Sequence, residues 1–188
     1  MAAGILLLLA AGGFWICSRM EDAQAGTTAQ LAVQDLKQTR EEAPARVEPA
    51  EETLPLEPEL PVVEIDGEAY VGELSIPALE LDLPVMQSWS YPNLKKAPCR
   101  VCGSSRTGDL VIAAHNYRSH FGRLHTLAVG DAVCFTDGDG IRNQYTVQKV
   151  EIHSPTDVEE VEHSDFPLVL YTCTYGGKTR VGVFGARA

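Results

Sequence analysis

Residues 171–183 read YTCTYGGKTRVGV, which places a cysteine and an arginine seven positions apart with two glycines between them. A Gly-Gly pair between two apolar runs is typical of a two-residue hairpin turn. In that register, positions whose numbers add to 353 face each other, so Cys173 lies opposite Arg180. Directly opposed side chains on one face of a hairpin are about 5 Å apart at Cβ. The stretch therefore predicts a thiol and a guanidinium side by side.

The same register assigns the two faces of the hairpin. Four apolar residues share the face opposite to the thiol and are expected to enter the core: Leu168, Leu170, Val181 and Val183. A guanidinium beside a thiol favours the thiolate and can later bind an oxyanion, because it is a planar and permanently charged fork. We interpret Cys173 and Arg180 as the start of a catalytic site.

Short apolar runs broken by turn residues continue upstream of this hairpin, from about residue 73. They include ELSIP, LDLPVM, DLVIAAH, DAVCFTDGDG and NQYTVQKVEIH. This rhythm predicts an all-β domain of seven or eight strands, which fits a small closed barrel or a sandwich rather than any helical layout.

A thiol nucleophile also needs a group that accepts and donates protons near neutral pH, and histidine is the usual one. His115 follows the apolar run LVIAA, at the end of a strand, where a side chain can reach a substrate. The other four histidines fall in turns, loops or a strand end: His120, His125, His153 and His163. His115 is therefore the candidate general acid and base.

The net charge of −11 over 188 residues is concentrated near the N-terminus, because residues 18–68 hold 4 basic and 13 acidic residues. No basic patch with interleaved aromatics is present in the sequence, so nucleic acid is not an expected partner. The Ala-, Glu- and Pro-rich residues 19–67 predict an acidic, solvated stalk, in which residues 30–40 form at most a turn or two of helix. Residues 68–188 then form the folded domain.

Residues 1–18, MAAGILLLLAAGGFWICS, carry no charge, and Trp15 stands where an aromatic ring would meet lipid headgroups. At 1.5 Å per residue such a helix is roughly 26 Å long, which suits a short transmembrane anchor or a signal-anchor. Ala23-Gln24-Ala25 matches a signal-peptide cleavage pattern, but charged residues separate it from the apolar run. We expect a single N-terminal transmembrane helix.

The pair Cys99-x-x-Cys102 raises the question of a metal. Zinc is not expected, because no second pair follows at a suitable spacing. A strained local disulfide or two free thiols are the remaining interpretations. No metal and no cofactor is therefore assigned to the chain.

The segments LVIAAHN and LYTCTY, together with Arg180, resemble the sortase family of surface transpeptidases, and the resemblance extends over residues 73–188. TCTY and AAHN are most similar to class B sortases, although only SPTDVEEVEHSDF stands where that class has a long helical insertion. The resemblance implies a closed eight-stranded β-barrel carried on an N-terminal membrane helix and displayed outside a Gram-positive-type cell.

The resemblance also implies residue roles and partners. Cys173 would be the nucleophile, His115 the general acid and base, and Arg180 the group that positions substrate and stabilises the oxyanion. Thr172 and Asn116 would contact substrate. Sortases cleave an LPXTG-like sorting motif near the C-terminus of secreted proteins, and then pass the acyl group through a thioester to an amine of peptidoglycan or of a pilin.

Some sortases bind calcium through acidic loop residues, and Glu159, Glu160 and Glu162 lie in the corresponding loop. A solvated, charged surface is the simpler interpretation of this cluster.

Two other functions fit part of the pattern. An L,D-transpeptidase-like cell-wall enzyme also uses cysteine, histidine and arginine, but close together in sequence, whereas here Arg180 and His115 lie seven and fifty-eight residues from Cys173. A non-catalytic, wall-binding β-barrel on the cell surface would keep the strands and the anchor without needing these three residues. Selective modification of Cys173 by a thiol reagent would separate the enzyme from the binding protein.

Overall fold

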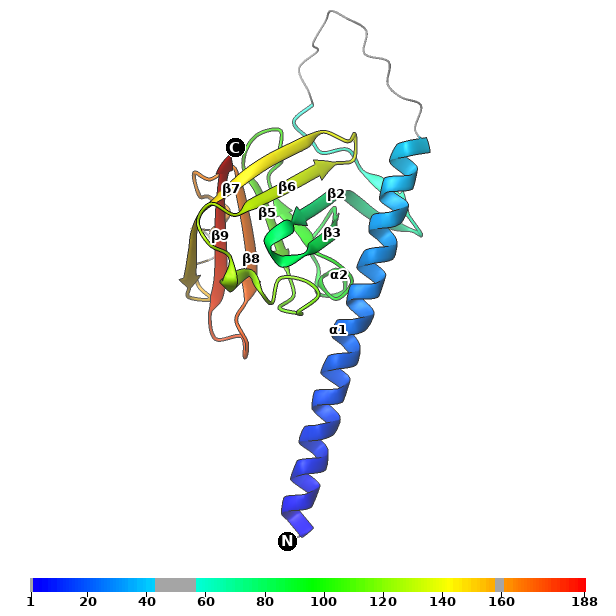
Figure 1. The fold of residues 1–188 in the computed structure, drawn as a ribbon, viewed down its shortest axis with the longest axis vertical. Helices are drawn as coiled ribbons and strands as arrows, with labels where there is room; N and C mark the ends of the chain where they lie inside the picture. The colour runs from blue at the N-terminus through cyan, green and yellow to red at the C-terminus, as the bar shows by residue number, and fades with distance from the viewer. Residues whose placement is uncertain (1, 43–56, 158–160) are drawn as a thin grey trace, which may run out of the picture.

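The apolar runs of the sequence form one β-sheet that curls back on itself (Figure 1). The computed structural model describes residues 2–42, 57–157 and 161–188. Its strands are β1 (Val63–Ile65), β2 (Glu68–Ile76), β3 (Leu81–Met86), β4 (Cys99–Cys102), β5 (Leu110–Ala114), β6 (Ala132–Asp137), β7 (Arg142–His153), β8 (Leu168–Cys173) and β9 (Arg180–Arg187). Its helices are α1 (Ala2–Glu42), the short α2 (Tyr91–Leu94) and the 3-10 turns η1 (Pro77–Leu79) and η2 (Leu124–Thr126).

Eight of the described strands form a closed barrel. Their order around the ring is β2–β3–β4–β5–β8–β9–β7–β6, and β6 pairs back with β2. The pairs β3–β4 and β5–β8 are parallel, while the other pairs are antiparallel. A closed ring has no free edge that could pair with another chain. The predicted eight-stranded barrel is confirmed, and β1 is an additional strand that pairs with β2.

The hairpin of β8 and β9 has the register that the sequence predicts. Gly176 and Gly177 have φ angles of 83° and 71°. These values lie in the left-handed region, which residues with a Cβ atom rarely adopt. Cys173 pairs with Arg180 across the turn. The four apolar residues of the opposite face are all buried in the barrel core: Leu168, Leu170, Val181 and Val183.

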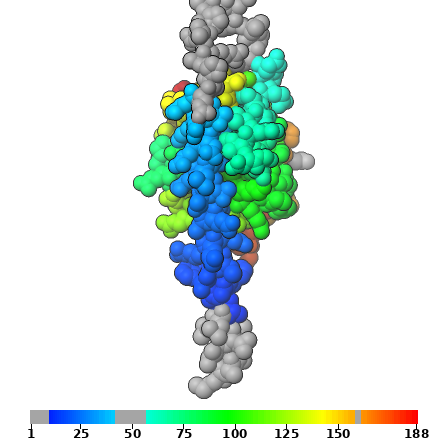
Figure 2. Space-filling model, turned by 90° about the vertical axis from the view of Figure 1, so that its right-hand side faces the viewer, coloured from blue at the N-terminus to red at the C-terminus, as the bar shows by residue number. Residues whose placement is uncertain are grey.

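Helix α1 is continuous and lies along the side of the barrel (Figures 1 and 2). It packs on β1, β2 and β3. Its buried residues lie on one face: Ala25, Ala29, Ala32, Val33 and Leu36. The expectation of a solvated stalk is therefore wrong for the part of it that lies in α1. The small alanine side chains on the buried face let the helix approach the strands closely.

The C-terminal part of α1 is also joined to the barrel by charged groups. Lys37 Nζ lies 2.9 Å from Glu73 Oε1. Arg40 Nη2 donates a hydrogen bond of 3.2 Å to the carbonyl oxygen of Asp137. The side chain of Glu73 is only 8% exposed, and a buried carboxylate without a partner is costly. The barrel therefore depends on the helix to neutralise one of its own charges.

The first part of α1 extends beyond the barrel, and its side chains Phe14, Trp15 and Ile16 are exposed. Within the described ranges, no helix has a stretch long and apolar enough to cross a membrane. The structure thus does not support the transmembrane helix expected over residues 1–18. Residues 43–56, the Pro- and Glu-rich part of the predicted stalk, lie outside the described residues.

The docking of α1 predicts unequal effects for two leucines on this helix. Replacing Leu36, which is buried against the barrel, by alanine should lower the free energy of unfolding by about 2 kcal/mol, in the range for a buried leucine. The control Leu31→Ala, at a position that is 57% exposed, should change it by less than about 0.5 kcal/mol. Urea denaturation followed by circular dichroism measures both values. Equal values would show that the helix is not docked in solution.

Candidate active site

Cys173 is the last residue of β8 and Arg180 the first of β9, so both lie at the turn end of the hairpin, and they project from its outer face. Their neighbours Thr172 and Val181 are buried and point into the barrel. Because side chains alternate along a strand, Cys173 and Arg180 point outward. Both are half-buried. The hairpin therefore presents a thiol and a cation together at the edge of the barrel.

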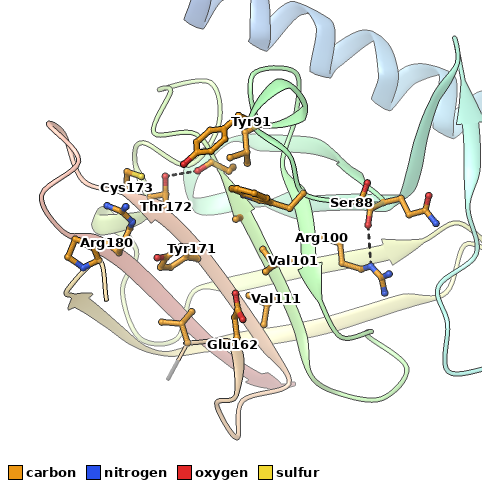
Figure 3. A pocket seen from close by; sticks show the side chains of 17 residues that line it. Ser88, Tyr91, Arg100, Val101, Val111, Glu162, Tyr171, Thr172, Cys173 and Arg180 are labelled. Atoms are coloured by element: carbon orange, nitrogen blue, oxygen red, sulfur yellow. Dashed lines mark hydrogen bonds between the residues drawn. The ribbon is translucent and has the colours of Figure 1, made fainter. Parts of the chain in front are cut away.

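The guanidinium of Arg180 is held in place by the hairpin. Its Nη1 donates to the carbonyl oxygens of Gly177 at 2.9 Å and Thr179 at 3.1 Å. It also interacts with the hydroxyl of Tyr171, on the same face of β8 as Cys173 (Figure 3). Burial raises the pKa of Tyr171, and nearby Arg180 offsets only part of this rise. A fixed cation and a neutral hydroxyl thus stand next to the thiol.

A cavity of about 630 Å³ lies over the outer face of β4, β5 and β8, and both Cys173 and Arg180 line it (Figure 3). Figure 3 shows these two residues at one side of the cavity and Arg100 at the other. Most of the walls are apolar, with side chains that include Leu94, Val101, Val111, Ala113, Val161 and Tyr171. A cavity of this size and polarity suits a short extended peptide with apolar side chains. The thiol is then within reach of the peptide backbone.

Two aromatic side chains, Trp89 and Tyr91, lie at the rim of this cavity. Their ring centroids are 5.1 Å apart in an edge-to-face arrangement. They are 46% and 72% exposed, respectively. Sequence reasoning assigned them no role, because the segment that holds them reads as a loop. Their position makes them a candidate contact surface for substrate.

Thr172 joins the ends of the two central strands. Its Oγ1 donates a hydrogen bond of 2.8 Å to the carbonyl oxygen of Ala114, at the end of β5. Its side chain is buried, and it also forms part of the cavity wall. Thr172 therefore fixes the position of the next residue, Cys173, relative to β5.

His115 is the first residue after β5, and its position follows from the parallel register of β5 and β8. Ala114 pairs with Thr172, so the next positions, His115 and Cys173, lie at adjacent strand ends. The imidazole of His115 stacks on the ring of Tyr117, with 4.6 Å between centroids and 13° between planes. His115 is not among the described residues that line the cavity. The structure thus brings the backbone of His115 to the strand end beside Cys173, while its ring stacks on Tyr117.

Asn116, the other predicted substrate contact, serves the same junction. Its Nδ2 donates to the carbonyl oxygen of Thr174, which follows Cys173, at 3.4 Å. This bond connects the loop after β5 with the end of β8. In this structure Asn116 holds two backbone segments together and does not line the cavity.

The remaining histidines and cysteines are placed differently. His120 is fully buried, and burial lowers its pKa to about 4, so it is neutral at physiological pH. Cys99 is fully buried in β4, and burial raises its pKa to about 12. Cys102 is half-buried, with its pKa raised by burial and by Glu162. Both cysteines are free and belong to a strand, so the interpretation as a disulfide is not supported.

The acidic cluster considered for calcium is only partly visible. Glu159 and Glu160 lie outside the described residues. Glu162 lines the cavity together with Arg180 and Arg100. It therefore adds a negative charge to a site that also holds two guanidinium groups.

Sequence reasoning also missed Tyr117, which stacks on the histidine, and the acidic residues of α1 that contact its loop. Tyr117 Oη donates to Glu21 Oε2 at 3.4 Å, and Asp22 accepts hydrogen bonds from Arg118 and Ser119. Tyr117 follows His115 by two positions, which is a weak signal. The partners on α1 are more than ninety residues away in sequence, so no local pattern indicates them.

Comparison with known proteins identifies the family. A family model described as a Sortase domain matches residues 74–188, more than half of the chain. The chain belongs to the sortase family. The resemblance seen in the sequence is thereby confirmed, and this sortase belongs to a family of cysteine transpeptidases.

Individual relatives of this sortase carry the names sortase A and sortase C. The chain is 29% identical to sortase A of Bacillus anthracis over 115 residues, which are 58% of the chain and 54% of the relative. It therefore spans about half the length of this relative.

Two solved structures show similar folds. The structure of sortase C1 from Streptococcus agalactiae has a TM-score of 0.56 and 27% identity, over 66% of this chain and 70% of that chain. The structure of Clostridium perfringens sortase C with the C-terminal cell wall sorting motif has a TM-score of 0.55 and 24% identity, over 63% and 70%. Because the identity to the Clostridium perfringens structure is only 24%, that similarity is evidence for the fold alone.

The surroundings of the cysteines predict different reactivities. We expect a methanethiosulfonate reagent at neutral pH to modify Cys173 at least about tenfold faster than Cys99, because Cys99 is fully buried and its raised pKa leaves little thiolate. Timed quenching and peptide mass analysis measure both rates, with the exposed Cys17 as the reference for an unhindered thiol. Equal rates at Cys173 and Cys99 would count against an accessible nucleophile.

Proposed function

We propose that this sortase uses Cys173 to cleave an LPXTG-like sorting motif near the C-terminus of secreted proteins. The acyl group is then transferred to an amine of peptidoglycan or of a pilin. The observation that carries this proposal is the cross-strand pair of Cys173 and Arg180 at one side of an apolar cavity. Membership of the sortase family alone does not say which motif is cleaved or which amine accepts the acyl group.

The first half of the reaction forms a thioester. Cys173 gives its thiol proton to His115, and its Sγ attacks the carbonyl carbon of the scissile peptide bond. The carbonyl oxygen becomes an oxyanion that Arg180 stabilises with its fixed N–H groups. When the C–N bond breaks, His115 donates a proton to the leaving amine. The acyl chain remains on Sγ, and the free amine departs with the C-terminal part of the substrate.

The second half of the reaction transfers the acyl group. An incoming amine attacks the thioester carbon, and His115, now neutral, accepts a proton from that amine. The C–S bond breaks, and Cys173 is released. A thioester suits this exchange, because it keeps the acyl group activated until an amine displaces the enzyme.

We propose that His115 turns its ring to take part in both steps. In the structure its imidazole rests on Tyr117, while its backbone is next to Cys173. In this proposal, rotation about the side-chain torsions moves the ring from Tyr117 toward the thiol, and the strands stay in place. We propose that substrate in the cavity favours the rotated position.

The cavity supports an apolar, extended substrate. Val101, Val111 and Tyr171 form walls that a leucine and a proline side chain can contact. The sortase C of Clostridium perfringens was solved with a cell wall sorting motif, and that protein has the same fold. A sorting motif of the LPXTG kind is therefore the substrate class that we propose for this chain.

The setting of the reaction is part of the proposal. Secreted substrates and cell-wall amines require the barrel to lie outside the cell, and residues 1–18 would hold it at the membrane of a Gram-positive-type cell. The match of the chain to a sortase domain favours this function over an L,D-transpeptidase-like enzyme or a non-catalytic barrel.

The proposal is tested by incubating the full chain in detergent with a pool of Leu-Pro-X-Thr-Gly peptides, with and without added amines. We expect cleavage after the threonine, and amide products when an amine is present. Mass analysis identifies both products. Failure to cleave any member of the pool would contradict the substrate class, and hydrolysis without transfer to any amine would contradict the transferase step.

Variants of Cys173 and His115 separate the two chemical roles. Cys173→Ala should abolish cleavage and the thioester, because Cys173 is the one cysteine among the described residues that line the cavity, whereas the control Cys102→Ala should keep both. His115→Ala should reduce turnover by about 10²- to 10⁴-fold, the usual contribution of a general acid. Intact-protein mass spectrometry measures the thioester. Its formation at the normal rate in His115→Ala would remove His115 from the mechanism.

The substitution Arg180→Lys tests the oxyanion role. Lysine keeps the positive charge but lacks the planar fork, so turnover should fall on the order of 10²-fold, as for other losses of an oxyanion donor. Lys178→Ala is the matched control, because Lys178 is an exposed cation on the same hairpin. Peptide cleavage kinetics measure both variants. Near-normal turnover of Arg180→Lys would reduce Arg180 to a simple counter-charge.

A further inference from the structure

The loop that carries His115 is attached to helix α1. The backbone N–H groups of Ser119 and Arg118 donate to the carboxylate of Asp22 at 3.0 and 3.2 Å. Ser119 Oγ donates to the carbonyl oxygen of Asp22 at 3.0 Å. Burial acts to raise the pKa of Asp22, but these hydrogen bonds outweigh it and the net pKa is lowered. An ionised carboxylate on α1 therefore holds the backbone of the loop.

The helix and the loop are also in close van der Waals contact. A Cβ added at Gly26 would lie 2.9 Å from Ser119 Cβ, which is closer than real side chains approach. His120, the next residue of the loop, is fully buried. Its imidazole interacts with the backbone of Ala25 on α1. The loop thus fits against one turn of α1, with Asp22 at one side of the contact and Gly26 at the other.

Tyr117 connects this contact to the histidine. One face of its ring stacks on the imidazole of His115, and its hydroxyl donates to Glu21 on α1. The ring of Tyr117 is therefore fixed at its far end by the helix. Because the imidazole rests on that ring, the orientation of His115 depends on where α1 lies.

We propose that α1 is part of the active site of this sortase, with Asp22 and Tyr117 as positioning residues for His115. This inference rests on the function proposed above. Asp22 fixes the backbone of the loop, and Tyr117 forms the wall from which the imidazole turns toward Cys173. A proton donor that starts from a defined position loses less entropy in reaching the substrate, and small misplacements of such a group lower the rate of the chemical step.

A second docking point on the same helix provides the control. Lys37 pairs with Glu73, and Arg40 bonds to Asp137, far from the histidine loop. Asp22 and Lys37 are fifteen positions apart, which corresponds to about 22 Å along a helix at 1.5 Å per residue. A role limited to holding the helix on the barrel would make the two docking points equivalent. If α1 positions His115, only the docking point at Asp22 should affect the orientation of the His115 ring.

The experiment compares Asp22→Ala with Lys37→Ala in the full chain in detergent. The first readout needs no substrate: it is the set of imidazole proton resonances of His115, assigned by their loss in His115→Gln. We expect Asp22→Ala to shift or broaden them and Lys37→Ala to leave them unchanged. Tyr117→Leu should remove the ring-current shift from the stacked phenol, whereas Tyr117→Phe should retain most of it.

The second readout is the cleavage of the Leu-Pro-X-Thr-Gly peptide pool. Asp22→Ala should lower kcat by about tenfold and change KM by less than about twofold, because the loop moves but the cavity does not. Asp22→Asn keeps one acceptor oxygen for the loop and should recover part of the lost kcat. Lys37→Ala should leave kcat unchanged.

The outcomes distinguish the two proposals. If Asp22→Ala and Lys37→Ala change kcat and the His115 resonances to the same extent, or if Asp22→Ala changes neither, the positioning role is overturned. If the unmodified chain cleaves no peptide of the pool, the proposed substrate is wrong, and the resonances of His115 still decide whether α1 positions its ring.

Discussion

The parallel pairing of β5 with β8 is the constraint on which the site depends. It places Ala114 opposite Thr172, and the Thr172 hydroxyl bonds to the Ala114 carbonyl oxygen at the point where both strands end. All residues of β5 are buried, and those of β8 are buried except Tyr171 and Cys173, which line the cavity. One face contributes Leu110 and Leu170 to the barrel core, and the other faces a smaller cluster with Val161 and Phe184. A slip of one residue would exchange these faces, so the register is strongly specified.

The β8–β9 hairpin adds a second, local constraint. Two glycines in the left-handed region set the turn, and the turn sets the pairing of Cys173 with Arg180. The nucleophile and the cation therefore sit on rigid strands, while His115 begins a loop. A side chain on a loop needs more support than one on a strand, which gives the contacts of α1 with that loop a physical purpose.

The packing unit of this sortase extends beyond its family domain. The family match begins at residue 74, but the helix stripe from Ala25 to Leu36 is buried against the strands. Glu73, just before the match, depends on Lys37 for its charge partner. The acidic N-terminal third is thus not uniformly a solvated segment, since Asp22 is used to hold the histidine loop.

Local chemistry in the sequence determined the hairpin, the inward face with Leu170 and Val183, and the all-β rhythm. Each of these depends on neighbours only a few residues apart, so turn residues and alternation were enough to predict them. The sequence resemblance also named His115, but the reason that it lies beside Cys173 is a pairing of strands fifty-eight residues apart, which no local pattern specifies.

The tertiary structure alone decided the place of α1. Its buried face consists largely of alanines, whose small apolar surface gives a weak periodic signal within an acidic composition that is typical of solvated segments. Only the surface of the folded barrel shows what those alanines pack against. The hydrogen bonds of Asp22 with Ser119 arise in the same way, because they join residues ninety-seven positions apart that meet only after the barrel has closed.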